Sequence, residues 1–170
     1  MKKIFQFALV TAVACVLTAC GSKSQQSPEE QKAAEELAAK GAVFEGKNYT
    51  VTYPDFLKET YKNDITINAE GDDVHFDATF SDYPCKPADF EQYYKNFTGV
   101  SMRSEWIFDA PVIDGNIMTF KGVYAEIEEV NFVVFLDASA GVAGKLKFPV
   151  AKASEMEPKV MPILKTIKKK

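Results

Sequence analysis

Apolar and polar residues alternate along several short segments of this 170-residue chain. The alternation covers residues 43–53, 65–68, 73–80 and 117–125. A period of two places one face of a strand in a core and leaves the other face in water. We therefore predict that these segments are strands of a half-buried sheet.

Turn-forming residues separate the predicted strands. Pro54 ends the first one, and residues 55–62 after it are expected to form a short helix or a turn. Glu70-Gly71-Asp72-Asp73 predicts a tight turn that joins the second strand to the third. Asp114-Gly115, or the residue pair after it, predicts another hairpin turn with a strand on each side.

Residues 130–136 form a nearly continuous apolar run. Such a run predicts a central strand that is covered on both faces. Gly141 and Gly144 indicate the next turn, and residues 145–150 are expected to form the last strand.

A first helix is predicted between Ser27 and Gly41. Ser27 suits the N-cap, Pro28 suits the first helical position, and Glu30 completes a capping box. Gly41 is a natural stop. Leu37 is the only large hydrophobic residue of this helix, so we expect a solvated stalk with little to bury.

Two more helices are predicted further along the chain. Residues 87–97 carry aromatic residues at intervals of three and four, which gives the helix an aromatic face. A C-terminal helix has apolar residues at the same spacing, although Pro158 and Pro162 leave its start open, because an interior proline costs a helix about 3 kcal/mol. Residues 43–170 are therefore expected to be one α+β domain, a mainly antiparallel sheet packed with helices.

The first 20 residues differ from the rest of the chain. Lys2 and Lys3 precede an apolar run at residues 4–17, the pattern of a secretory signal. The run is shorter than the ~20 residues that a membrane-spanning helix needs. Residues 1–19 are therefore predicted to be a signal peptide.

Leu17-Thr18-Ala19-Cys20 resembles the lipobox of bacterial lipoproteins. The resemblance implies cleavage between Ala19 and Cys20 and a diacylglyceryl group on the Cys20 sulfur. The alternative is an ordinary signal peptide that happens to contain a cysteine. Two acyl chains give lasting membrane attachment, so residues 20–42 would be a lipidated tether that includes the polar helix. Gly21, in place of the aspartate of an inner-membrane retention signal, favours the outer membrane if the host has one.

The charge of the mature chain argues against a nucleic-acid partner. Removal of Lys2 and Lys3 with the signal leaves 18 of the 20 basic residues against 24 acidic ones, a formal charge of −6. An acidic surface without a basic stripe gives nucleic acid nothing to hold. The one basic cluster, Lys165 with residues 168–170, is expected to be a solvated helix end, and contact with anionic lipid headgroups is the alternative.

Cys85 is the only cysteine left once the signal is removed and Cys20 is lipidated, so no disulfide can form within the mature chain. It lies in a proline-framed loop before the predicted helix at residues 87–97. A helix start lowers the pKa of a nearby thiol, which would make Cys85 reactive. A buried, inert cysteine is the interpretation that we favour.

Residues that carry common catalytic or metal chemistry are scarce. The single histidine, His75, shares a strand face with Asp77 and is expected to be exposed. Zinc sites need several histidine or cysteine ligands, and the chain contains neither a nucleophile elbow nor a glycine-rich phosphate loop. We therefore expect that the protein is not an enzyme and that it holds no metal ion and no cofactor. Acidic clusters at Glu70-Asp72-Asp73 and Glu126-Glu128-Glu129 leave a carboxylate-dependent hydrolase open, and the first is expected to be a solvated turn.

Aromatic residues offer a candidate binding surface. Core packing is the favoured interpretation for Tyr93, Tyr94 and Phe97 on the predicted helix. Tyr94 and Trp106 are nevertheless the candidates for a partner or ligand surface, because amphipathic aromatic side chains commonly anchor interfaces.

The segment Asn48-Tyr49-Thr50-Val51-Thr52-Tyr53-Pro54-Asp55 resembles the "Y-x-V-x-Y-P" start of PsbP-like domains. The order of later strands and helices is also similar, and the resemblance covers residues 43–168. It implies an antiparallel sheet sandwiched by helices, a fold found in small envelope lipoproteins and in assembly factors of larger complexes. It supplies no catalytic residue.

Three hypotheses for function follow. The first is a non-catalytic interaction or assembly module, tethered to a membrane through lipid on Cys20, with an envelope protein as partner. The second is a domain that binds a small molecule or lipid in an apolar cavity between sheet and helices. The third is a hydrolase, which requires paired acids in one cleft with raised pKa values.

Overall fold

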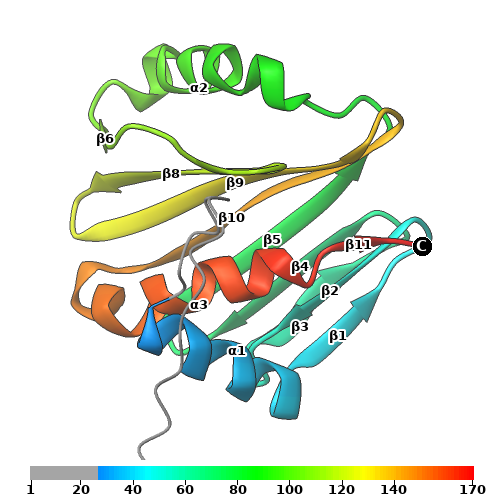
Figure 1. Ribbon diagram of the computed structural model, residues 1–170. Helices are drawn as coiled ribbons and strands as arrows, with labels where there is room; N and C mark the ends of the chain where they lie inside the picture. The colour runs from blue at the N-terminus through cyan, green and yellow to red at the C-terminus, as the bar shows by residue number, and fades with distance from the viewer. Residues whose placement is uncertain (1–26) are drawn as a thin grey trace, which may run out of the picture.

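Two antiparallel sheets and three α-helices make up residues 27–170, the part of the chain that this computed structural model describes, apart from the side chain of Ser101 (Figure 1). The expected α+β architecture, mainly antiparallel and packed with helices, is confirmed. The predicted signal peptide, the lipidation site Cys20 and the start of the predicted tether lie outside the described residues.

The larger sheet has eight strands in the order β3-β4-β5-β10-β9-β8-β6, and β7 pairs with β8 beside β6. Its strands are β3 (Lys58–Lys62), β4 (Thr66–Gly71), β5 (Val74–Ser81), β6 (Ile107–Phe108), β7 (Val112–Asp114), β8 (Ile117–Tyr124), β9 (Ile127–Asp137) and β10 (Ala140–Pro149). Tight hairpins join β4 to β5, β8 to β9 and β9 to β10. The first of these turns contains Asp72 and Asp73 with φ values of 51° and 60°, as the acidic turn sequence predicted.

The smaller sheet has the order β1-β2-β11, with β1 (Ala42–Glu45), β2 (Tyr49–Tyr53) and β11 (Lys168–Lys169). The single strand expected at residues 43–53 is therefore a hairpin of two strands. Lys165 and residues 168–170 are exposed, as expected, but residues 168–170 do not belong to a helix end, because the last helix ends at Lys165. Lys168 pairs with Thr50 in the sheet, and Lys169 forms an ion pair of 2.7 Å with Asp137, so these lysines are held by backbone pairing and an acidic partner.

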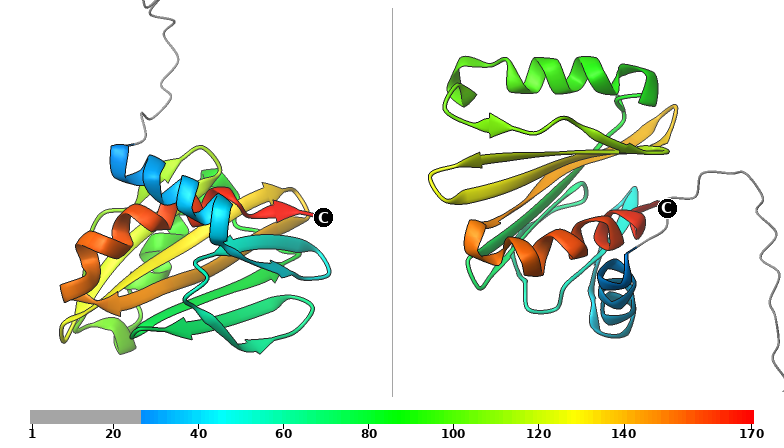
Figure 2. Two further views of the ribbon diagram at one scale, coloured as in Figure 1. Left: turned by 90° about the horizontal axis from the view of Figure 1, so that it is seen from below. Right: turned by 60° about the vertical axis from the view of Figure 1, so that its left-hand side comes forward.

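Three α-helices lie on the two sides of the larger sheet, and the first of them packs on the third rather than on the sheet itself (Figure 2). They are α1 (Pro28–Lys40), α2 (Phe90–Thr98) and α3 (Ala153–Lys165). α1 and α3 lie on the side of the smaller sheet, and α2 covers β8 and β9 from the other side. α3 contains both Pro158 and Pro162, and its buried Met156, Ile163 and Leu164 provide the packing that offsets the prolines.

α1 begins with the predicted capping box. The Ser27 hydroxyl accepts a hydrogen bond from the Glu30 backbone N–H, and the Glu30 carboxylate accepts one from the Ser27 N–H. The expected solvated stalk is wrong for these residues, because Ala33 and Leu37 are buried against α3 and Leu37 belongs to the larger core. One leucine and one alanine suffice to attach a helix of low overall hydropathy when a neighbouring helix is available.

Two other expectations differ from the structure. Residues 58–62, expected as helix or turn, form the fully exposed edge strand β3, whose charged side chains are typical of edges that avoid further pairing. β10 begins at Ala140, so Gly141 and Gly144 lie inside a strand. A Cβ at Gly144 would come within 2.0 Å of the Asp77 carbonyl oxygen, so the close approach of β5, rather than a turn, requires glycine there.

Two hydrophobic cores lie on opposite faces of the larger sheet. The larger core joins it to α3, α1 and the smaller sheet, around residues such as Tyr53, Phe76 and Phe132. The smaller core joins α2 to β8 and β9 through Phe90, Met118, Phe120 and Val133. α2 covers only the β8 and β9 end of its face of the larger sheet. The other strands expose this face to water, so their residues on it are polar.

Candidate functional site

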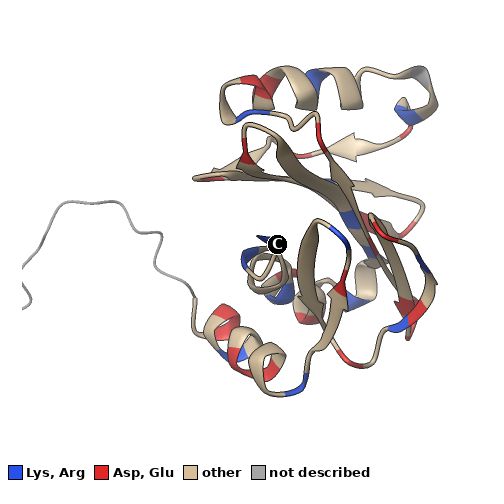
Figure 3. Cartoon of the chain, turned by 90° about the vertical axis from the view of Figure 1, so that its right-hand side faces the viewer, with Lys and Arg blue, Asp and Glu red and all other residues tan. Residues whose placement is uncertain are grey.

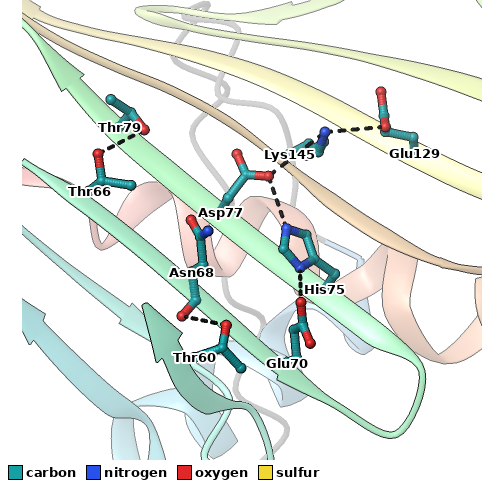
Figure 4. A network of polar contacts seen from close by, with 9 residues as sticks. All are labelled: Thr60, Thr66, Asn68, Glu70, His75, Asp77, Thr79, Glu129 and Lys145. Carbon is teal, nitrogen blue, oxygen red and sulfur yellow. Dashed lines mark hydrogen bonds and ion pairs between the residues drawn. The ribbon is translucent and has the colours of Figure 1, made fainter. Parts of the chain in front are cut away.

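The candidate site is the part of the larger sheet that lies beyond α2. Alternate residues of β4, β5 and β10 point away from the larger core, and they are half-buried or exposed while their neighbours are buried. We call this surface the open face. Its polar residues are Thr60, Thr66, Asn68, Glu70, His75, Asp77, Thr79, Glu129 and Lys145 (Figure 4).

Charged side chains of alternating sign, with one histidine among them, cross the open face in a row, which we call the ion-pair row. Its members, in order, are Arg103, Glu129, Lys145, Asp77, His75 and Glu70. Arg103 Nη1 lies 2.6 Å from Glu129 Oε1, and Lys145 Nζ lies 3.7 Å from Glu129 Oε2. Lys145 Nζ is also 4.0 Å from Asp77 Oδ2. His75 closes the row, with Nε2 3.2 Å from Asp77 Oδ2 and Nδ1 2.9 Å from Glu70 Oε1.

The two-residue period of the strands brings this row together. Lys145 on β10 lies opposite Asp77 on β5, and His75 on β5 lies opposite Glu70 on β4. Directly opposite residues on antiparallel strands share a face with their Cβ atoms about 5 Å apart. Acidic and basic positions therefore lie next to one another on the strands of the large sheet (Figure 3).

Arg103 stands at the border between the open face and the α2 cover. Its guanidinium carbon lies 4.2 Å from the centre of the Phe97 ring and 5.3 Å from that of Trp106. These contacts and the short Glu129 ion pair fix the arginine on three sides. The Arg103 side chain is 21% exposed, so part of it remains accessible at this border.

Two polar residues of β9 are buried beneath this border. Glu129 is 3% exposed and Asn131 is 5% exposed. Glu129 has Arg103 and Lys145 as partners, whereas the Asn131 Nδ2 has no hydrogen-bond partner among the described residues. Burial also raises the pKa of Asp77, while Lys145 and His75 act in the opposite direction. The open face is thus a charged surface that is partly shielded from water.

The turn end of the open face is hollowed. A shallow depression of about 720 Å³ lies there, lined by residues that include Thr60, Glu70, His75, Lys145 and Lys147. It is a broad dish rather than an enclosed pocket, which suits a protein surface better than a buried small molecule.

The structure places the two candidate surface aromatics on the α2 side of the sheet. The Tyr94 ring packs edge-on against Phe120, and its hydroxyl donates a hydrogen bond of 3.0 Å to the Asp109 carbonyl. Trp106 stacks on Phe108 at 6.1 Å between ring centres. Core packing of the aromatic face of α2 is confirmed, and Trp106 borders the open face through Arg103. A partner role for Tyr94 and Trp106 stays a prediction.

Cys85 is half-buried beside a pocket of about 240 Å³ between β10 and α2. Burial raises the pKa of its thiol, and the nearby Asp89 carboxylate acts in the same direction. Both effects lower the thiolate fraction, so they favour the inert interpretation over a reactive thiol.

A second acidic group, which we call the acid cluster, lies on the opposite face of the sheet. It consists of Asp109, Glu128 and Glu157 around Lys121. Lys121 Nζ is 2.9 Å from Glu157 Oε1, 3.7 Å from Asp109 Oδ2 and 3.9 Å from Glu128 Oε2. Burial, with the neighbouring Glu157, raises the pKa of Glu128 to about 7.

One further pocket lies between α1, α3 and the loop after β2. It has a volume of about 270 Å³ and is lined by Ala33, Leu37, Phe56, Lys159 and Ile163, among others. This volume lies below the usual range for small-molecule sites, about 300–1,000 Å³. Within residues 27–170 no group of three His, Cys, Asp or Glu side chains is arranged to hold a metal ion, and no helix is long and apolar enough to cross a membrane.

Sequence patterns missed most of these residues. His75 was expected to be merely exposed, but two carboxylates hold it. Arg103 and Glu129 lie 26 positions apart, and Lys121 and Glu157 lie 36 apart, so no local spacing connects them. The one available signal was charge beside an apolar run, because Glu128 and Glu129 directly precede the strand core at residues 130–136.

The fold is similar to that of several known structures. Cyanobacterial PsbP (CyanoP) from Synechocystis sp. PCC 6803 gives a TM-score of 0.54 at 8% identity, over 91% of this chain and 99% of that chain. The Saccharomyces cerevisiae Ran-binding protein Mog1p gives 0.52 at 11% identity, over 75% of this chain and 94% of that chain. No family model and no curated protein matches the sequence. At these identities the similarity shows the fold alone, and it confirms the expected PsbP-like architecture.

Proposed function

We propose that the protein is a bacterial lipoprotein of the cell envelope that acts as a non-catalytic interaction module. Lipid on Cys20 holds it to a membrane, the outer membrane in a host with two, and the open face binds a protein partner. The ion-pair row is the observation that carries this proposal. A charged, half-buried surface that no helix covers within residues 27–170 is suited to recognition by complementary charge.

The broad shape of the site supports a macromolecular partner. The depression at the turn end is open, and the rest of the open face is spread over five strands. One structure with a similar fold is named a Ran-binding protein, which is in keeping with a binding role for this fold. Glu128 and Glu157 meet part of the requirement for a hydrolase, but neither residue lines any of the pockets described above, so we do not assign them to catalysis.

The anchor is tested by fatty-acid labelling in cells. We expect Cys20→Ala to abolish incorporation of labelled fatty acid, because the variant lacks the sulfur to which the lipid is attached. Cys15→Ala is the matched control, a cysteine of the signal segment that should leave labelling intact. Labelling of the Cys20→Ala variant would disprove the anchor.

The partner surface is tested by site-specific photo-crosslinking in cells. A photoreactive residue at Thr79, an exposed position of the open face, is expected to capture a discrete partner. The same residue at Glu91, exposed on the outside of α2, is the control. Lys145→Glu should weaken the Thr79 adduct by placing a third acid between Asp77 and Glu129. Identical adducts from both positions, or an adduct insensitive to Lys145→Glu, would contradict the proposal.

A further inference from the structure

Exposed apolar and aromatic side chains gather at one end of the domain, and we call this surface the apolar tip. Met102 is 93% exposed and Ile107 is 76% exposed, and three other members are between 42% and 49% exposed. Exposed apolar surface that forms one patch marks contacts with proteins or membranes. The members of the tip are Val100, Met102, Trp106, Ile107, Tyr124 and Val150.

The turn between β8 and β9 brings the aromatic members of the tip together with Ile107. Tyr124 is the last residue of β8, and the centre of its ring lies 5.7 Å from that of Trp106. Ile107 on β6 pairs with Val123, the residue before Tyr124. These three side chains therefore lie at the same end of the larger sheet.

Backbone hydrogen bonds add the rest of the tip to this end. The Val150 N–H, directly after β10, donates a hydrogen bond of 2.9 Å to the Glu126 carbonyl in the β8–β9 turn. Two successive turns fold the loop after α2: the Arg103 N–H donates to the Val100 carbonyl, and the Trp106 N–H donates to the Arg103 carbonyl. Four segments that are distant in the sequence thus form one surface.

α1 begins at the same end of the molecule as the apolar tip. α3 starts three residues after Val150, and α1 packs along it with its first turn at the same end (Figures 1 and 2). Residues 21–27 separate Cys20 from Pro28, and a chain of this length spans at most about 30 Å. The 11-residue strand β9 alone is about 36 Å long. A lipid on Cys20 therefore brings the tip closer to the bilayer than the far end of the sheet.

We infer that the apolar tip rests in the surface of the bilayer to which the protein is anchored. This inference rests on the lipid proposed at Cys20 and adds a second, non-covalent contact. Met102 and the aliphatic members enter the boundary between headgroups and acyl chains, about 5–10 Å deep, and Trp106 and Tyr124 suit the headgroup level. The strands of the larger sheet then stand upright on the membrane, and the open face is turned sideways toward a partner on the same membrane.

The charges around the tip favour an apolar contact over attraction to anionic lipid. Glu105 and Glu126 are exposed beside it, and Arg103 is paired with Glu129 at 2.6 Å. Lys152, near Val150, donates to a backbone carbonyl of the β4–β5 turn. Burial of apolar surface therefore provides most of the contact. The short tether keeps the bilayer at a high effective concentration, which favours it over a freely diffusing protein as the occupant.

The single tryptophan of the chain supplies the measurement, because Trp106 belongs to the tip. The full-length protein with its lipid is reconstituted into phosphatidylcholine vesicles, either ordinary or with bromine near the headgroup end of the acyl chains. Bromine quenches only an indole ring that it approaches closely, so the brominated vesicles should lower Trp106 emission about twofold. Addition of phosphatidylglycerol should leave the quenching unchanged, because the contact is apolar.

Two variants assign the quenching to the tip. Met102→Asp and Ile107→Asp each place a charge at a highly exposed position, so both should fold normally, as circular dichroism can verify, and both should lose most of the quenching. Tyr83→Ser is the matched control. Tyr83 is 90% exposed and follows the end of β5 that lies away from the tip, so this variant should be quenched like the natural protein.

Flotation of the same vesicles separates this inference from the anchor. Protein that does not float with the vesicles lacks the lipid anchor, and both proposals are then wrong. Protein that floats but emits equally in ordinary and brominated vesicles keeps the anchor and overturns the bilayer contact of the tip, which would then be a surface for another protein. Quenching that persists in both Met102→Asp and Ile107→Asp would also overturn that contact.

Discussion

Glu128 and Glu129 are neighbours on β9 that point to opposite faces of the same sheet. Each residue is 3% exposed, so both carboxylates are removed from water to the same extent. Glu129 meets Arg103 at 2.6 Å and Lys145 at 3.7 Å. Glu128 has only Lys121 as a cationic partner, at 3.9 Å, and its other polar neighbour is the Glu157 carboxyl, which raises its pKa.

The difference shows that two equally buried carboxylates can make different contributions to the free energy of folding. A buried carboxylate is tolerated when close cationic partners replace the lost water, and it is costly when they do not. On the open face the protein supplies its own partners, so the ion-pair row is complete before anything binds. In the acid cluster the cationic partner of Glu128 is more distant, and a proton held between Glu128 and Glu157 takes its place. The first surface is preorganised and the second is poised to change its charge.

Removal of Arg103 should produce the largest effect. Arg103→Ala leaves Glu129 buried with Lys145 alone and removes the contact with the Phe97 ring, so we expect the free energy of unfolding to fall by about 3 kcal/mol. Urea denaturation at neutral pH measures the loss. Adding Glu129→Gln to this variant should recover part of the stability, because the uncompensated charge is gone. A loss below about 1 kcal/mol would show that Glu129 does not depend on this ion pair.

Neutralising Glu128 should have a smaller effect of the opposite sign. Its pKa of about 7 in the folded state exceeds the ordinary value of 4.5, so the folded protein holds the proton more strongly than the unfolded chain. The resulting stability is fully present below pH 4.5 and is lost as the pH rises through about 7. Glu128→Gln should match the natural protein near pH 4.5 and exceed its free energy of unfolding by about 1–2 kcal/mol at pH 8, since Glu157 shares the titration.

The same measurement on Glu129→Gln provides the contrast. This variant weakens two close ion pairs, so at pH 8 we expect a loss of about 1–2 kcal/mol where Glu128→Gln shows a gain. Denaturation curves at pH 5 and pH 8 compare the variants. A loss of stability for both would mean that Lys121 compensates Glu128 as fully as Arg103 compensates Glu129.

The sequence predicted the folded elements better than it predicted these two acids. Capping residues located α1, alternation located β5, and the apolar run located β9, because each signal lies within one segment. β3 was missed because an exposed edge strand has no buried face to impose alternation. The surroundings of the two acids depend on residues far away in the sequence, namely Arg103 for Glu129 and Lys121 with Glu157 for Glu128. These residues come close only after the sheet has formed and the helices have packed.

The far end of the ion-pair row should give the smallest effect. His75 keeps 28% of its side-chain exposure, and its partner Glu70 keeps 55%, so water screens this pair far more than the pair of Arg103 with Glu129. We expect His75→Gln to lower the free energy of unfolding by about 0.5 kcal/mol, the ordinary net contribution of an exposed hydrogen bond or ion pair.

A change in salt concentration should separate the effect of His75→Gln from that of Arg103→Ala. At pH 5, where a histidine ordinarily carries a positive charge, raising the ionic strength to 1 M shortens the screening distance to about 3 Å, which should remove the effect of His75→Gln and leave most of the effect of Arg103→Ala. Urea denaturation of both variants at low and high salt measures the two responses. If His75→Gln costs as much as Arg103→Ala, the row acts as one cooperative network. If the costs differ as expected, its rigid part is the buried end at Glu129, and the exposed end at Glu70 is the part that would exchange its contacts for those of the proposed partner.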